Sequence, residues 1–213
     1  MIPMIVPISL TKQLRLSLII LPLVVIFTSF DINNASGITY SNFTSEQYKI
    51  KFQYPSDWTV DEKTSRFDEG TSIKLSSPSL GAGDFFIQYA NDLLTGFGNT
   101  DLKAAVYETL KDAISDYKYK YSIIEKPYFI KIGDKDAGTF VYSWKDKYED
   151  YATLWGTQMW IVFVGENGYL INFMQPASSF DNADSTEIRD RLINSIEFLD
   201  KDNTTNTQLS RFG

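Results

Sequence analysis

Residues 48–58, YKIKFQYPSDW, constrain the fold of this chain more than any other segment. Apolar residues occupy every second position of its first half: Tyr48, Ile50, Phe52 and Tyr54. This period of two predicts a β-strand with one buried face. The strand is expected to end at Pro55, because proline has no N–H to donate to a β-ladder. Trp58 then gives the next segment a large apolar anchor.

Similar patterns further along the chain predict the rest of a sheet. They indicate strands at residues 73–75, 85–89, 130–132, 138–144, 155–164 and 169–174. Asn167-Gly168, between two apolar runs, is typical of a β-hairpin. Near-continuous hydrophobicity over residues 159–164 predicts a central strand that is covered on both faces.

Two stretches are rich in charge. Residues 61–70, DEKTSRFDEG, predict a solvent-exposed loop. In residues 117–121, YKYKY, tyrosine and lysine alternate, a mixture that also occurs in nucleic-acid grooves. In an acidic chain we favour an edge strand with its lysines facing solvent.

Two amphipathic helices are predicted. The first covers residues 101–117, with Thr100 or Asp101 as its N-cap. Its apolar residues share one stripe: Leu102, Val106, Leu110, Ala113, Ile114 and Tyr117. The second helix begins at Asp184-Ser185-Thr186-Glu187, which has the pattern of a capping box, and residues 194–199 pass into a short final strand. Helices must cover the apolar faces of such a sheet, so we expect an α+β fold, an α/β/α sandwich with a central, mainly antiparallel β-sheet.

Composition limits the chemistry that is open to this chain. It contains no histidine and no cysteine, which excludes a Ser-His-Asp triad, a cysteine nucleophile, thiolate or imidazole metal sites and disulfides. The net charge is −7, and an acidic surface repels phosphate backbones, so nucleic acid is not expected as a partner. The chain also lacks the GxSxG, GxxxxGK[ST] and GxGxxG motifs.

The N-terminal region has the pattern of an export signal. Lys12 and Arg15 precede the apolar run of residues 16–30, which is shorter than the roughly 20 residues that a membrane span needs. We therefore expect residues 1–37 to be a signal peptide or an N-terminal membrane anchor, residues 38–199 a single domain and residues 200–213 a disordered polar tail. The basic flank predicts an extracytoplasmic domain, secreted or anchored to the outer face of the cytoplasmic membrane. Three Asn-x-Ser/Thr sequons follow, at Asn34, Asn42 and Asn203.

The order of these elements resembles the PsbP/Mog1-like family over about residues 47–199. The matching segments, in order, are YPSDW at residues 54–58, Ile132-Gly133, Ala137-Gly138, residues 168–171 (GYLI) and residues 193–198 (INSIEF). The last segment is similar to the closing strand of the family. The resemblance implies the sandwich fold, and the N-terminal segment favours an exported prokaryotic relative over a plastid one.

The resemblance also implies a function, because many relatives are extrinsic subunits or assembly factors without enzymatic activity. We expect a non-enzymatic exported accessory protein that binds a membrane-associated protein complex on the extracytoplasmic face. One alternative is a module that binds a divalent cation or a small ligand, and another is a hydrolase of unrecognised mechanism.

 We also expect the protein to be a monomer and not to bind nucleic acid.

Two acidic clusters are candidate cation sites. Asp146, Glu149 and Asp150 lie in one predicted turn, and a second cluster at the start of the last helix comprises Asp181, Asp184 and Glu187. Carboxylate oxygens suit Ca²⁺ or Mn²⁺, which are the candidate ions. Neither cluster has the spacing of an EF-hand loop. Solvated loop charge, and helix capping at Asp184 and Glu187, remain the alternative interpretations.

The four tryptophans are candidate anchors. We expect Trp58 and Trp160 to lie in the core. Trp144 and Trp155 flank the acidic turn, and aromatic side chains beside charges are typical of protein-binding hot spots. These two residues are therefore the candidate protein-binding residues, with burial in the core as the alternative.

Overall fold

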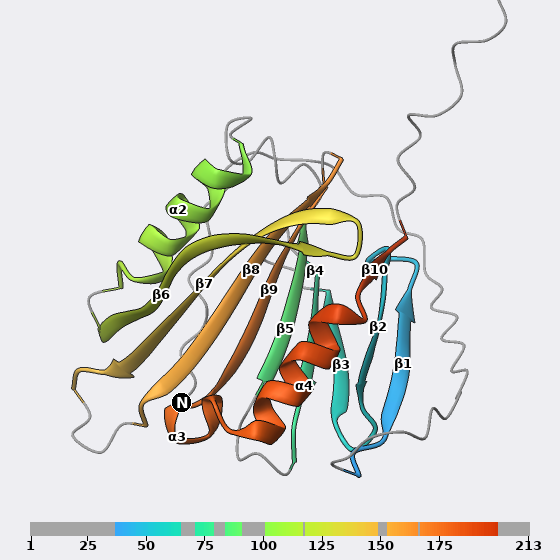
Figure 1. Cartoon of the computed structure of the whole chain (residues 1–213), viewed down its shortest axis with the longest axis horizontal. Helices are drawn as coiled ribbons and strands as arrows, with labels where there is room; N and C mark the ends of the chain where they lie inside the picture. Colours follow the sequence, from blue (N-terminus) through green and yellow to red (C-terminus); the bar gives the residue numbers. More distant parts are fainter. Residues whose placement is uncertain are drawn as a thin grey trace, which may run out of the picture.

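A seven-stranded antiparallel sheet forms the centre of the molecule. The computed structural model describes residues 37–64, 71–78, 84–90, 101–116, 118–148, 153–165 and 167–199. The strand order is β3-β4-β5-β9-β8-β7-β6, so β3 and β6 are the two edges (Figure 1). The strands are β3 (Thr59–Thr64), β4 (Thr71–Ser76), β5 (Asp84–Ala90), β6 (Tyr119–Ile132), β7 (Lys135–Asp146), β8 (Trp155–Val164) and β9 (Asn167–Pro176).

A second, three-stranded sheet lies against the first. It contains β1 (Tyr40–Ser45), β2 (Ile50–Pro55) and β10 (Glu197–Phe198) in the order β1-β2-β10, with every pair antiparallel. Strand β2 is the alternating segment of the sequence, and Tyr48, Ile50 and Phe52 are buried as their spacing predicts. The ring of Phe52 lies 6.2 Å from that of Phe85 in the large sheet. The small sheet therefore closes part of the core.

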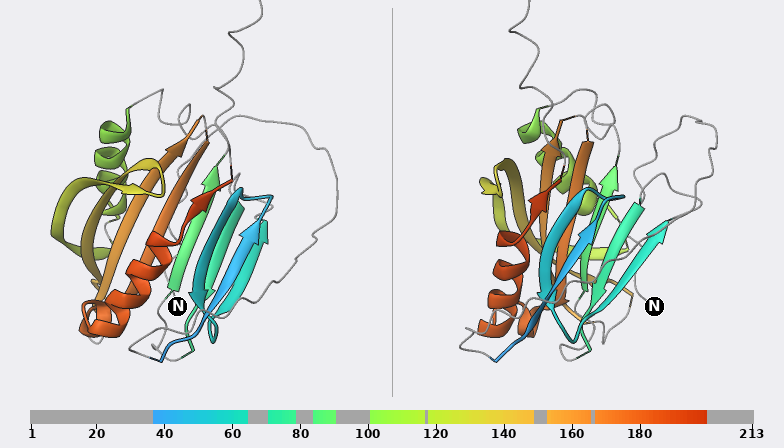
Figure 2. Two further views of the ribbon diagram at one scale, coloured as in Figure 1. Left: turned by 45° about the vertical axis from the view of Figure 1, so that its right-hand side comes forward. Right: turned by 90° about the vertical axis from the view of Figure 1, so that its right-hand side faces the viewer.

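Within the described residues, three helices complete the layers. Helix α2 (Leu102–Ala113) covers one face of the large sheet at β7 and β8. On the other face lie α3 (Ala177–Phe180), α4 (Ala183–Asn194) and the small sheet (Figures 1 and 2). The two faces carry separate apolar clusters, with Trp58 and Trp160 in the larger one. The predicted α/β/α sandwich with an antiparallel sheet is confirmed, and the predicted burial of both tryptophans is confirmed with it.

Three local predictions are wrong. Residues 61–64 belong to strand β3, because their backbone pairs with β4, although the charges of the segment predicted a loop. The predicted hairpin forms between β8 and β9, but Asn167-Gly168 belongs to strand β9 and not to the turn, since Asn167 already pairs with Val164 and Gly168 with Phe163. Helix α4 begins at Asn182, whose side chain accepts a hydrogen bond from the N–H of Ser185, and not at the expected capping box.

The first helix and the edge strand agree more closely with expectation. Asp101 caps α2 by accepting a hydrogen bond from the N–H of Ala104, 2.8 Å away. Strand β6 forms the predicted edge, with Lys118 and Lys120 exposed. Tyr117 lies outside the described residues.

The terminal predictions also fall outside the described residues. They include the export signal or anchor within residues 1–36, the tail of residues 200–213 and the sequons at Asn34 and Asn203. Asn42 lies in β1. Among the residues that the structure describes, no helix is long and apolar enough to cross a membrane.

Candidate functional site

Strand β6 exposes an unusual amount of apolar side chain. Four of its residues are between 38% and 52% exposed: Ile123, Ile124, Tyr128 and Phe129. All four lie in the seven-residue segment 123–129 of β6, which is an edge strand of the large sheet. Clustered exposed apolar residues are typical of interaction surfaces, whereas single ones are common everywhere. We call these four residues the β6 apolar edge.

Two irregularities in the pairing of β6 with β7 produce this exposure. The register passes from Ile123 opposite Tyr142 to Glu125 opposite Val141, and then to Tyr128 opposite Thr139. In each step β6 carries one residue more than β7, which is the signature of a β-bulge. Bulges bend a strand strongly, and the β6–β7 hairpin curves over the sheet in Figure 1.

The bulges also determine how the edge can bind. They interrupt the regular row of backbone groups that a new strand would need, and Pro127, which lies within the second irregularity, lacks an N–H. Addition of a partner strand is therefore disfavoured along the middle of β6. What the edge offers to a partner is its apolar side chains.

Charged residues flank the β6 apolar edge. Lys118, Lys120 and Lys126 are exposed, and Glu125 lies between the apolar residues. Burial of the phenol and the nearby Glu125 carboxylate raise the pKa of Tyr128 above its usual value, while a hydrogen bond from Gln158 opposes this shift. Tyr128 is thus neutral at physiological pH and contributes an apolar ring with one polar end.

The structure brings the side chains of Trp144 and Trp155 together, but most of their surface is buried. They are opposite residues of β7 and β8, and their rings stack with centroids 6.0 Å apart. Trp144 is only 8% exposed, and its indole N–H donates to the hydroxyl of Thr157 at 3.0 Å. Trp155 is half-buried. The pair packs against the α2 side of the sheet, and its role in binding stays a prediction.

The acidic turn is described only in part. Asp146 ends β7, is half-buried and accepts a hydrogen bond from the N–H of Tyr148 at 2.7 Å. Glu149 and Asp150 lie outside the described residues. Within the described part of the chain, no group of three acidic residues is placed to hold a metal ion. The expected Ca²⁺ or Mn²⁺ site at this turn stays a prediction.

The second acidic cluster is spread around the start of α4. Asp181 precedes the helix, Asp184 lies exposed in its first turn, and Glu187 is half-buried one turn later. Glu187 contributes to the raised pKa of Tyr40, whose main cause is burial. Asp181 forms a long ion pair of 4.0 Å with Arg189. The three carboxylates therefore have different surroundings.

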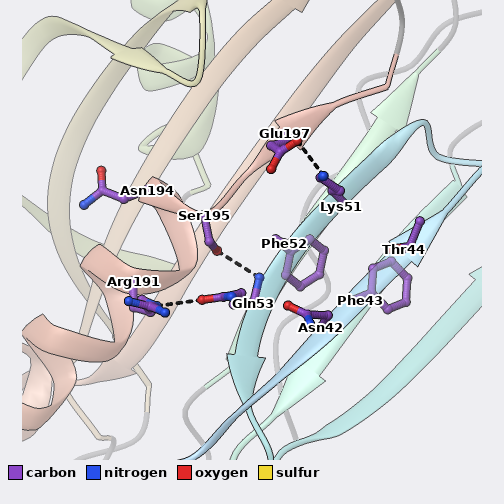
Figure 3. A pocket seen from close by; sticks show the side chains of 10 residues that line it. All are labelled: Asn42, Phe43, Thr44, Lys51, Phe52, Gln53, Arg191, Asn194, Ser195 and Glu197. Atoms are coloured by element: carbon purple, nitrogen blue, oxygen red, sulfur yellow. Dashed lines mark hydrogen bonds and ion pairs between the residues drawn. The ribbon is translucent and has the colours of Figure 1, made fainter. Parts of the chain in front are cut away.

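A groove of about 550 Å³ lies between the small sheet and the C-terminal half of α4 (Figure 3). Arg191 donates from Nε to Oε1 of Gln53 at 2.7 Å, and its guanidinium lies 5.4 Å from the ring centroid of Tyr40. The hydroxyl of Ser195 accepts from the N–H of Gln53 at 2.8 Å. Lys51 and Glu197 form an ion pair of 2.7 Å at the rim.

These contacts give the groove a structural role. Helix α4 and strand β2 are distant in sequence, and the bonds from Arg191 and Ser195 to Gln53 join them where β10 stops pairing with β2. Gln53, Arg191, Ser195, Lys51 and Glu197 all use polar groups for these contacts within the fold. The groove could not be predicted from the sequence, because no local pattern shows that α4 packs beside β2.

The chain was compared with protein-family models, curated proteins and solved structures. No family model and no curated protein matches it. The fold is similar to the solution structure of cyanobacterial PsbP (CyanoP) from Synechocystis sp. PCC 6803, with a TM-score of 0.58 and 10% identity over 78% of this chain and 98% of that one.

Two further solved structures resemble it more distantly. A crystal structure from Bacteroides thetaiotaomicron VPI-5482 has a TM-score of 0.48 and 20% identity, and covers 76% of this chain and 48% of that one. A protein of unknown function, PA94 from Pseudomonas aeruginosa, has a TM-score of 0.44 and 11% identity over 70% and 92% of the two chains. The similarity to CyanoP extends over nearly the whole of that protein, and the chain therefore has the PsbP-like fold that its sequence motifs predicted.

Proposed function

We propose that this chain is a non-enzymatic accessory protein that binds a membrane-associated protein complex on the extracytoplasmic face. The PsbP-like fold supports the proposal, since many members of the PsbP/Mog1-like family that this chain resembles are extrinsic subunits or assembly factors. The pattern of residues 1–37, a basic flank before an apolar run, supports the extracytoplasmic location.

One observation carries the proposal, the β6 apolar edge. Burying a large apolar side chain contributes about 1.5–3 kcal/mol relative to leaving it exposed. Ile123, Ile124 and Phe129 forgo much of that contribution in the isolated chain, since each is at least 45% exposed. A partner that covers them recovers it. The flanking lysines would favour an acidic surface around the apolar contact on the partner.

Site-specific cross-linking tests the proposal. A photoreactive amino acid replaces Ile124, and the full-length chain is irradiated in its native membranes. We expect a cross-linked product that contains a subunit of a membrane complex. Tyr107 on α2 is the matched control, because it is 50% exposed but belongs to a helix and not to strand β6. A probe at position 107 should not give the same product.

A substitution makes the same test independent of the probe. Ile124→Asp places a charge in the apolar contact, and we expect the full-length chain to stop co-migrating with the complex on native gels. Because Ile124 is 52% exposed, the substitution should leave the thermal unfolding midpoint nearly unchanged. Tyr107→Asp should keep the association. Equal products from positions 107 and 124, or association that survives Ile124→Asp, would contradict the proposal.

A further inference from the structure

A separate cleft of about 250 Å³ lies between the bulged part of β6 and helix α4. Val141, Trp160 and Phe180 line it, and each is almost fully buried. The volume is just below the roughly 300–1,000 Å³ of pockets that hold drug-sized ligands. The cleft therefore suits a small molecule with an apolar part.

Arg189 of α4 also lines this cleft and is poorly neutralised. Its side chain is only 13% exposed, and its guanidinium lies 5.1 Å from the ring centroid of Phe180 and 5.9 Å from that of Phe173. Its ion pair with the exposed Asp181 is long, at 4.0 Å. Among the described residues no oxygen accepts a hydrogen bond from the guanidinium. The guanidinium donors therefore stay available to a ligand in the cleft, and a carboxylate is the ligand that fits the planar fork of the guanidinium.

Three exposed carboxylates line the same cleft, and one of them, Asp181, is the long-range ion-pair partner of Arg189. Glu125 belongs to β6 and Asp190 to α4, so they line it from two elements. A simple anion that approached Arg189 would be repelled by them. A ligand that carries an ammonium group beside its carboxylate avoids this repulsion, because each of its charges then meets the opposite charge.

We propose that this cleft binds a free α-amino acid with an apolar side chain. The carboxylate of the amino acid pairs with Arg189, and its ammonium group lies at Glu125 and Asp190. Its side chain contacts the apolar lining. Ile124 and Tyr128 of the β6 apolar edge also line this cleft. The inference nevertheless goes beyond the proposed function and does not depend on it, because ligand binding is measured on the chain alone, without a protein partner.

Three related ligands test the proposal on the unchanged full-length chain by isothermal titration calorimetry. L-Leucine carries both charges, L-leucinamide lacks the carboxylate, and N-acetyl-L-leucine lacks the ammonium group. We expect leucine to bind roughly tenfold to a hundredfold more tightly than leucinamide, because a charge-assisted pair is lost. N-acetyl-leucine should also bind at least several-fold more weakly than leucine.

Two arginines on the same helix provide a matched pair of variants. Arg189→Gln should weaken leucine binding to about the level of leucinamide and leave leucinamide binding unchanged. Arg191→Gln removes the same charge two residues later, where the side chain lines the other groove, and should leave leucine binding unchanged. Asp190→Asn should weaken leucine and leucinamide but not N-acetyl-leucine.

Several results would overturn the assignment. They are no heat of binding with leucine, equal affinity for the three ligands, or an equal loss of leucine binding in Arg189→Gln and Arg191→Gln. If circular dichroism shows that Arg189→Gln does not fold, the comparison of the three ligands on the unchanged chain still decides. Failure here would leave the cross-linking result at position 124 untouched.

Discussion

Gly138 lies where helix α2 comes closest to the large sheet. A Cβ atom at this position would stand 2.1 Å from Cγ2 of Val106 and 3.2 Å from Cε1 of Phe129. Val106 is fully buried and cannot move aside without disturbing the helix. We expect Gly138→Ala to lower the free energy of unfolding by about 1–3 kcal/mol through overpacking, measured by urea denaturation.

Val106→Ala provides the control for this prediction. Alone it should destabilise the chain, because it leaves a cavity under α2. Combined with Gly138→Ala it should cost less than in the unchanged chain, since the new methyl group partly fills that space. Strict additivity of the two substitutions would show that α2 does not pack on Gly138 as described.

For single residues, the sequence predicted which side chains are buried but not which side chains they contact. The alternation of Tyr48, Ile50 and Phe52 placed them correctly in the core. The spacing of residues cannot show that Gly138 meets Val106, or that Arg189 packs on Phe180, because these contacts join segments whose meeting is decided by the fold. The same reason hid Arg189 as a candidate binding residue.

The start of helix α4 allows a prediction about a single element. The side-chain oxygen of Asn182 accepts from the N–H of Ser185 at 2.7 Å, whereas Asp184 is exposed in the first turn. Asn182→Ala should therefore cost about 0.5–2 kcal/mol of stability. Asp184→Ala should cost less, because it removes only a favourable charge near the helix N-terminus, worth about 0.3–1 kcal/mol. Urea denaturation of both variants measures these costs. A larger loss of stability in Asp184→Ala than in Asn182→Ala would contradict this assignment of the cap.

Elements were predicted more reliably than their ends. Tertiary context decides the start of α4, where Ser185 of the capping-box pattern is buried and donates its hydroxyl to Oε1 of Gln175 in β9. At residues 61–64 the charges predicted a loop, yet pairing with β4 holds the segment in a strand. In both places hydrogen bonds to another element of the fold override the local sequence pattern.

For the whole molecule, the sequence predicted the layers but not the division into two sheets. Strand β10 joins β2 across nearly the whole domain, through Glu197 opposite Lys51 and Phe198 opposite Ile50. A two-residue strand carries too little pattern to identify its partner. The curvature of β6 was equally hidden, because a bulge has no fixed sequence signature. The β6 apolar edge and the neighbouring cleft both depend on that curvature.

The α2-side core predicts how the whole molecule responds to alkaline pH. Burial raises the pKa of Tyr142 to about 12, and a hydrogen bond that the phenol oxygen accepts from the Thr157 hydroxyl opposes the shift. Between about pH 10, where tyrosine ionises in the unfolded chain, and pH 12, the unfolded state therefore holds fewer protons than the folded state. Stability is unaffected by this group below pH 10 and falls by up to about 1.4 kcal/mol per pH unit above it.

Tyr142→Phe should reduce this alkaline loss of stability. The variant lacks the ionisable phenol, so the free energy of unfolding should fall less steeply above pH 10, as measured by urea denaturation at a series of pH values. Any constant change in stability from the lost hydrogen bond to Thr157 appears equally at pH 7 to 9 and is subtracted there. Equal slopes for the two proteins between pH 10 and 12 would mean that Tyr142 ionises as readily in the folded chain as in the unfolded one, which is incompatible with a phenol enclosed between α2 and the sheet.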